Sequence, residues 1–222
     1  MSPDVDVVTN LLAMLPQLPD TRDEILGMAR AMGADVEKDV FFGRAANEET
    51  VKSLDLTKYR VIAFATHGLL PRDLDGLTQP ALALTAPQVA KVEGDGLLTM
   101  EKILALRMNA DWVVLSACNT ANGAGTGAEA ISGLGRAFFY AGARALLVTH
   151  WPVETRAART LTTELFQRQA ADAGVSRAKA LQQTMNWMID GSGITDPATG
   201  TQLFSFAHPI FWAPFALVGD GG

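Results

Sequence analysis

The chain is poor in the features that mark several common classes of protein. Its 222 residues include a single cysteine, Cys118, which excludes an intrachain disulfide and favours a reducing compartment. No apolar run reaches the roughly 20 residues that a membrane span needs. The first 20 residues have no basic segment ahead of their broken apolar stretch, so they do not resemble a signal peptide. We therefore expect a cytoplasmic protein.

An excess of basic charge is also missing. The formal net charge is −6, and the 18 basic and 24 acidic residues are mixed along the chain without a basic stripe. Direct contact with nucleic acid is therefore not expected. Hydrophobic residues, by contrast, make up 48% of the chain, enough for a sizeable core. We assign residues 1–19 to a lead-in segment and residues 20–222 to one large folded domain.

The apolar pattern predicts a sheet whose strands alternate with helices. Continuous apolar runs at 60–66, 111–117 and 145–149 are typical of strands buried on both faces. Further strands are expected at 39–42, 81–85 and 212–218, helices at 21–32, 47–54, 99–108, 128–140, 155–170 and 176–188, and irregular structure over most of 69–98 and 190–202. This alternation predicts the α/β class, with a mostly parallel sheet covered by helices on both faces.

Local signals mark where helices begin and end. Thr21 and Glu24 have the spacing of a capping box. Asn47 and Thr99 are suited to cap the helices that follow them. Gly142 is placed to end the helix at 128–140.

Two residues with the chemistry of a nucleophile and a base follow two of the strong strands. His67 comes after the run at 60–66, and Cys118 comes after the run at 111–117. The carboxyl ends of parallel strands meet at one edge of a sheet, where ligands bind. A lone cysteine is more often buried packing, and a core histidine is often satisfied by one hydrogen bond. Their shared position at strand ends nevertheless favours a cysteine hydrolase with a thiol–imidazole pair.

Neighbouring residues suggest supporting roles. Gly68 lets the backbone turn, and its N–H with that of Cys118 is suited to hold an oxyanion. His150 also follows a strand and is a competing base, although we prefer a place for it in the pocket wall.

Further residues around the cleft are assigned to substrate binding. Asn119 and Trp151 are placed there, and Glu154 is suited either to begin a helix or to select a basic substrate side chain. The glycines at 125 and 127 invite a nucleotide-binding hypothesis, but no acidic residue follows at the position that would hold a ribose.

These residues, in this order, resemble the CHAT domain family of caspase-like cysteine peptidases, which are related to caspases and separase. The matching stretches are LPDTRDEI, VIAFATHG, LLTMEKILALRMNADWVVLSACNTA, GAEAISGLGRAFFYAGARALLVTHWPVE and HPIFWAPFALVGD. The resemblance implies a three-layer α/β/α sandwich, with His67 as catalytic histidine and Cys118 as nucleophile. It also implies oxyanion donors at Gly68 and Cys118, a thioester acyl-enzyme, and no need for a metal or organic cofactor.

The resemblance has two departures. The segment His150-Trp151-Pro-Val-Glu154 carries one acid where relatives often carry two, and a histidine where they often carry an apolar residue. Family domains also often have another strand and helix, and commonly tetratricopeptide repeats, ahead of the matching segment. Three expectations therefore stay open: a compact member of the family, one of two separately encoded pieces, or a fragment of a longer protein that lacks the usual amino-terminal part. The expected partner is a regulatory protein or a tetratricopeptide-repeat region encoded elsewhere.

The sequence thus predicts a cysteine endopeptidase that cuts a protein substrate and is controlled by a partner or ligand. Two alternatives stay open. One is a caspase-like interaction module without catalysis, and the other is an amidase or transferase that uses the same pair on a small substrate.

Overall fold

The structure is a computed structural model and describes residues 3–116, 126–191, 193–196 and 198–222. Its centre is a sheet in the order β1-β5-β6-β9. The strands are β1 (Val61–Phe64), β5 (Trp112–Leu115), β6 (Ala145–Thr149) and β9 (Phe215–Gly219). The first three are parallel, and β9 runs antiparallel to β6 at one edge. The predicted mostly parallel sheet is confirmed.

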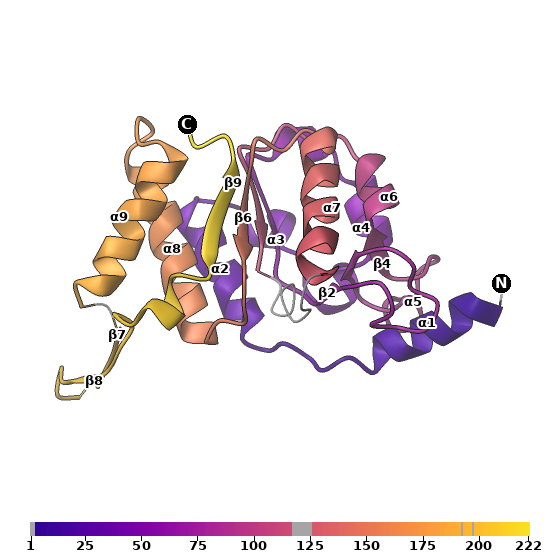
Figure 1. The fold of residues 1–222 in the computed structure, drawn as a ribbon, viewed down its shortest axis with the longest axis horizontal. Helices are drawn as coiled ribbons and strands as arrows, with labels where there is room; N and C mark the ends of the chain where they lie inside the picture. The colour runs from indigo at the N-terminus through magenta and orange to yellow at the C-terminus, as the bar shows by residue number, and fades with distance from the viewer. Residues whose placement is uncertain (1–2, 117–125, 192, 197) are drawn as a thin grey trace.

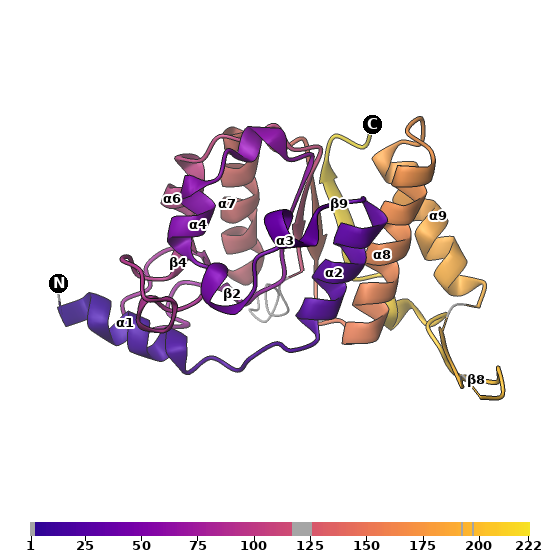
Figure 2. The same cartoon turned by 180° about the vertical axis from the view of Figure 1, so that it is seen from behind.

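Side chains alternate between the two faces of this sheet, and each face packs on its own helices. On β5, Trp112 and Val114 face one layer, while Val113 and Leu115 face the other. The first layer contains α2 (Thr21–Ala31), α8 (Thr155–Ala171) and α9 (Arg177–Ile189), and the second contains α4 (Glu48–Ser53), α6 (Met100–Leu104) and α7 (Thr126–Ala141). Figures 1 and 2 show the sheet between these layers, so the chain has the predicted three-layer α/β/α sandwich.

A smaller unit follows β1. The antiparallel strands β2 (Gly68–Leu69), β3 (Ala81–Ala83) and β4 (Leu97–Thr99) form a second sheet, accompanied by α1 (Pro3–Ala13) and α5 (Pro87–Ala90). Val8 and Leu12 of α1 are buried in the same apolar cluster as Leu69 of β2. Much of the region expected to be irregular is therefore ordered by packing with the start of the chain. None of the helices in the described ranges is both long and apolar enough to cross a bilayer.

Two local expectations are wrong. Residues 39–42 do not form a strand, because Asp39 ends the short helix α3 (Val36–Asp39), which Asp35 caps by accepting a hydrogen bond from the Glu37 N–H. The expected loop at 190–202 contains strand β7 (Gly193–Thr195) and ends at strand β8 (Gln202–Ser205), with which β7 forms a hairpin. β8 is exposed along its whole length, so the buried apolar pattern that identified the central strands is missing from it.

The capping box at the start of α2 is also wrong. Thr21 donates its hydroxyl to the Leu18 carbonyl, 2.6 Å away, and the N-cap residue is Asp20. Glu24 points into the protein instead and is 2% exposed. The caps at Asn47 and Thr99 are confirmed, because their side chains accept from the N–H groups of Thr50 and Lys102. Short 3₁₀ turns complete the fold at η1 (Gly43–Ala45), η2 (Leu56–Lys58) and η3 (Pro209–Phe211).

Candidate active site at the carboxyl edge of the sheet

His67 lies where the central sheet meets the small one. β1 ends at Phe64, whose carbonyl accepts from the Ser116 N–H at 3.0 Å, so the pairing with β5 continues beyond the strand. Three residues after Phe64, the His67 carbonyl accepts from the Ala83 N–H at 2.9 Å. The backbone of His67 is thereby tied to β3. The imidazole is half-buried at the carboxyl edge of the sheet.

The His67 ring is held by a backbone carbonyl from the start of the chain. Its Nε2 lies 2.8 Å from the Pro16 carbonyl oxygen. A carbonyl can only accept, so Nε2 carries the proton of this hydrogen bond. In the neutral imidazole Nδ1 is then the acceptor, which is the form a general base needs. Pro16 belongs to the segment between α1 and α2 that crosses below the sheet in Figures 1 and 2.

Gly68 has an N–H that the small sheet does not use. Gly68 is buried and lies opposite Leu82 of β3. The preceding pair, His67 and Ala83, is the hydrogen-bonded one. Bonded and non-bonded pairs alternate along an antiparallel ladder, so the Gly68 N–H points away from β3. Because β2 is the outer strand of its sheet, this N–H points out of the sheet altogether.

The predicted nucleophile lies outside the described residues, as does Asn119. β5 ends at Leu115, which pairs with Phe64 of β1. Cys118 follows Leu115 by three residues, as His67 follows Phe64 by three. The neighbouring parallel strands β1 and β5 therefore lead to the imidazole and the thiol at equivalent positions of the sequence.

The second histidine, His150, follows β6 on the other side of β5. Its backbone N–H donates to the Pro214 carbonyl at 2.9 Å, and its side chain is exposed. Trp151 beside it is 41% exposed. The roles of both residues at the cleft stay predictions.

Glu154 begins α8. Its Oε2 accepts from the Ala157 N–H at 2.8 Å, so the carboxylate caps the helix. A role in substrate selection must therefore coexist with this cap, and it remains a proposal.

The sequence indicates the imidazole of His67 but does not reveal its partner, the Pro16 carbonyl. The two residues are 51 positions apart, and nothing local in the sequence marks a carbonyl as a side-chain acceptor. Within the described residues, no group of three or more histidines, cysteines or acids is arranged to hold a metal ion.

The layers and the strand-end histidine define a protein of the caspase-like α/β/α class. Comparison with known families makes this specific: the family model for the CHAT domain matches residues 3–220, so the chain belongs to the CHAT domain family.

The curated relatives include tetratricopeptide repeat protein 28 from two mammals. The Mus musculus protein is 26% identical over 234 residues, which cover 91% of this chain and 9% of that protein. The Homo sapiens protein is 26% identical over 232 residues, which cover 91% and 8%. The chain thus spans less than a tenth of the length of these relatives.

Proposed function

We propose that the chain is a cysteine endopeptidase in which Cys118 is the nucleophile and His67 the base. The observation that carries this proposal is the hydrogen bond between His67 Nε2 and the Pro16 carbonyl. This hydrogen bond orients the imidazole that follows β1. The neighbouring strand, β5, leads to Cys118. A nucleophile, a base and a third group that orients the base are the parts of a covalent hydrolase.

The reaction begins when the Cys118 sulfur attacks the scissile carbonyl carbon and His67 Nδ1 takes the thiol proton. The Pro16 carbonyl stabilises the imidazolium through Nε2–H. The N–H groups of Gly68 and Cys118 hold the oxyanion of the tetrahedral intermediate. The imidazolium then protonates the leaving amine as the C–N bond breaks and a thioester forms. Water, deprotonated by His67, hydrolyses that thioester, releasing the acid and restoring the thiol.

The substrate of this site is a protein, and a partner controls access to it. The relatives are named for tetratricopeptide repeats and are more than ten times the length of the matched region, which supports a repeat region as the regulatory partner. The single cysteine supports a cytoplasmic location.

Cleavage of a diverse peptide library by the purified chain tests the function. We expect cleavage by the wild type and none by Cys118→Ala, with Cys118→Ser as a nearly isosteric control for folding. Cleavage that persists in both variants contradicts the proposal. If neither the wild type nor the variants cleave, rapid alkylation of folded wild type by iodoacetamide separates a chain that needs its activator from an interaction module whose thiol is buried. Turnover of small amides without peptide cleavage would instead support an amidase.

Glu154→Ala is expected to lower the free energy of unfolding by about 1 kcal/mol, because α8 loses the acceptor at its N-cap. Glu154→Ser keeps a capping oxygen and removes the charge, so it separates the two roles. If Glu154 also selects a basic substrate, both variants lose at least about tenfold in kcat/KM for cleavage after arginine, and nothing for cleavage after leucine. If the ratio of kcat/KM after arginine to kcat/KM after leucine is unchanged in both variants, Glu154 acts only as the helix cap.

A further inference from the structure

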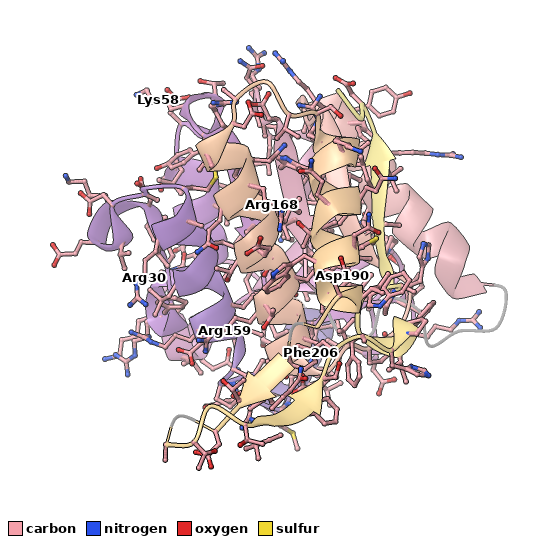
Figure 3. The ribbon with its side chains drawn as sticks, turned by 90° about the vertical axis from the view of Figure 1, so that its left-hand side faces the viewer. Arg30, Lys58, Arg159, Arg168, Asp190 and Phe206 are labelled. Carbon is pink, nitrogen blue, oxygen red and sulfur yellow. The ribbon has the colours of Figure 1, made fainter. Side chains whose placement is uncertain are left out.

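A carboxyl group is buried where β5 meets the layer of α2 and α8. Glu24 of α2 is 2% exposed. Its Oε2 accepts from the Ser116 hydroxyl at 2.9 Å, and its Oε1 lies 3.5 Å from Thr162 Oγ1 of α8. Figure 3 looks onto this layer and shows α2 and α8 side by side. One side chain therefore joins two helices and the end of the strand that leads to Cys118.

The two hydroxyls suit a neutral carboxylic acid. The Thr162 hydroxyl has a single proton, and its oxygen lies 2.9 Å from the Ala158 carbonyl, a better distance than the 3.5 Å to Glu24. When that proton goes to Ala158, the Thr162 oxygen faces Glu24 as an acceptor. A protonated carboxyl can donate to Thr162 while it accepts from Ser116, whereas an ionised carboxyl can only accept.

No basic side chain among the described residues forms an ion pair with Glu24. The charged residues in the groove between α2 and α8 are Asp23, Arg30 and Arg159, and Arg159 pairs with Asp23 at 3.2 Å. From β5, the group that reaches the carboxyl is the neutral Ser116 hydroxyl. Burial raises the pKa of Glu24 to about 7, against the lowering effect of the hydrogen bond from the Ser116 hydroxyl.

We propose that Glu24 is a pH-sensitive positioning residue, which as a neutral acid holds the end of β5 against α2 and α8 and on ionisation loosens this junction. Ser116 precedes Cys118 by two residues, so the junction also sets the start of the segment that carries the nucleophile. The effect on Cys118 rests on the proposed function, whereas the effect on the junction does not.

The stability of the fold is expected to depend on pH, because folded and unfolded Glu24 lose their proton at different pH values. An unfolded glutamate titrates near its ordinary value of 4.5, whereas the pKa of folded Glu24 is about 7. Between these values the folded state binds more protons, so the stabilisation is complete below pH 4.5 and is lost as the pH rises through about 7. From pH 5.5 to 8.5, Glu24 alone is expected to raise the unfolding equilibrium constant about 30-fold.

Urea unfolding of the wild type and Glu24→Gln at these two pH values tests the junction. Glutamine has the shape and the donors of the neutral acid, so the variant should lack the 30-fold change, whereas the exposed Glu37→Gln should retain it. Parallel pH dependence in the wild type and Glu24→Gln overturns the proposal. Should Glu24→Gln not fold, Ser116→Ala gives a second test. Loss of a hydrogen bond that favours the charged form should raise the pKa of Glu24 further, so the unfolding equilibrium constant should change by more than about 30-fold between the two pH values, and a change no larger than that of the wild type overturns the proposal.

Alkylation of Cys118, the only thiol of the chain, tests the effect on the nucleophile. The ratio of iodoacetamide rates for the wild type and Glu24→Gln is expected to be constant below pH 6 and to change at least about threefold as the pH rises through about 7, where folded Glu24 ionises. A ratio that is constant from pH 5.5 to 8.5 overturns the effect on Cys118. A stability difference in a chain that neither cleaves peptides nor reacts rapidly with iodoacetamide supports the junction and counts against the peptidase.

Discussion

Replacement of His67 by alanine is expected to lower kcat/KM for peptide cleavage by about 10²- to 10⁴-fold, the range that a positioned general base contributes. The Pro16 carbonyl holds the proton on Nε2, which leaves Nδ1 to take the thiol proton. Without the ring, the thiol must lose its proton to water, and the leaving amine loses its acid. The measurement is steady-state cleavage of the best library peptide.

The matched control is His150→Ala. This second histidine also follows a strand, but its side chain is exposed and its backbone is bound to Pro214. We expect kcat/KM to stay within about threefold of the wild type, while both variants unfold at nearly the same urea concentration. The reverse pattern, with cleavage lost in His150→Ala and kept in His67→Ala, would transfer the role of base to His150.

Gly142→Ala is expected to destabilise the protein by about 3 kcal/mol or more, because two costs add there. Gly142 follows α7 with φ of +111°, a conformation that side chains disfavour. An alanine Cβ would also lie 2.0 Å from the Met108 carbonyl oxygen, and this is backbone that cannot rotate away. The segment is fixed because the Met108 N–H donates to the Ala141 carbonyl at 2.8 Å.

Gly33→Ala isolates the conformational cost. Gly33 follows α2 with φ of +67°, and a Cβ there has nothing within 4 Å. We expect a loss of about 1 kcal/mol from urea unfolding, as for a single left-handed residue. Equal losses for the two variants would mean that the approach to Met108 costs nothing.

The sequence predicted those parts of the fold that show a local pattern of apolar or capping residues. β5 and β6 are buried on both faces and β1 is partly buried, so continuous apolar runs mark them. The side chains of Asn47 and Thr99 each accept a hydrogen bond from the N–H three residues later, and this spacing is visible in the sequence. The exposed hairpin β7–β8 has no buried pattern to reveal it.

The contacts around the site could be predicted less well, because they join distant residues. The partner of His67 is 51 positions away and is a carbonyl, which every residue has. Ser116 and Glu24 are 92 positions apart, and the place of Glu24 beside Thr21 pointed to a local cap. The residues that follow Thr21 predicted the helix α2 correctly, whereas the direction of the Glu24 carboxyl depends on how α2 packs on α8.

The hydrogen bond of His67 depends on how the start of the chain is packed, because its acceptor is the Pro16 carbonyl. The segment that contains Pro16 is anchored at one end by α1, whose Val8 and Leu12 are buried against the small sheet, and at the other end by α2, whose Met28 is buried against α8. Separation of either anchor is expected to withdraw the Pro16 carbonyl from His67 Nε2. The proton of His67, the proposed base, is therefore placed by two distant packing surfaces, and we expect a partially assembled chain to hold this ring out of alignment.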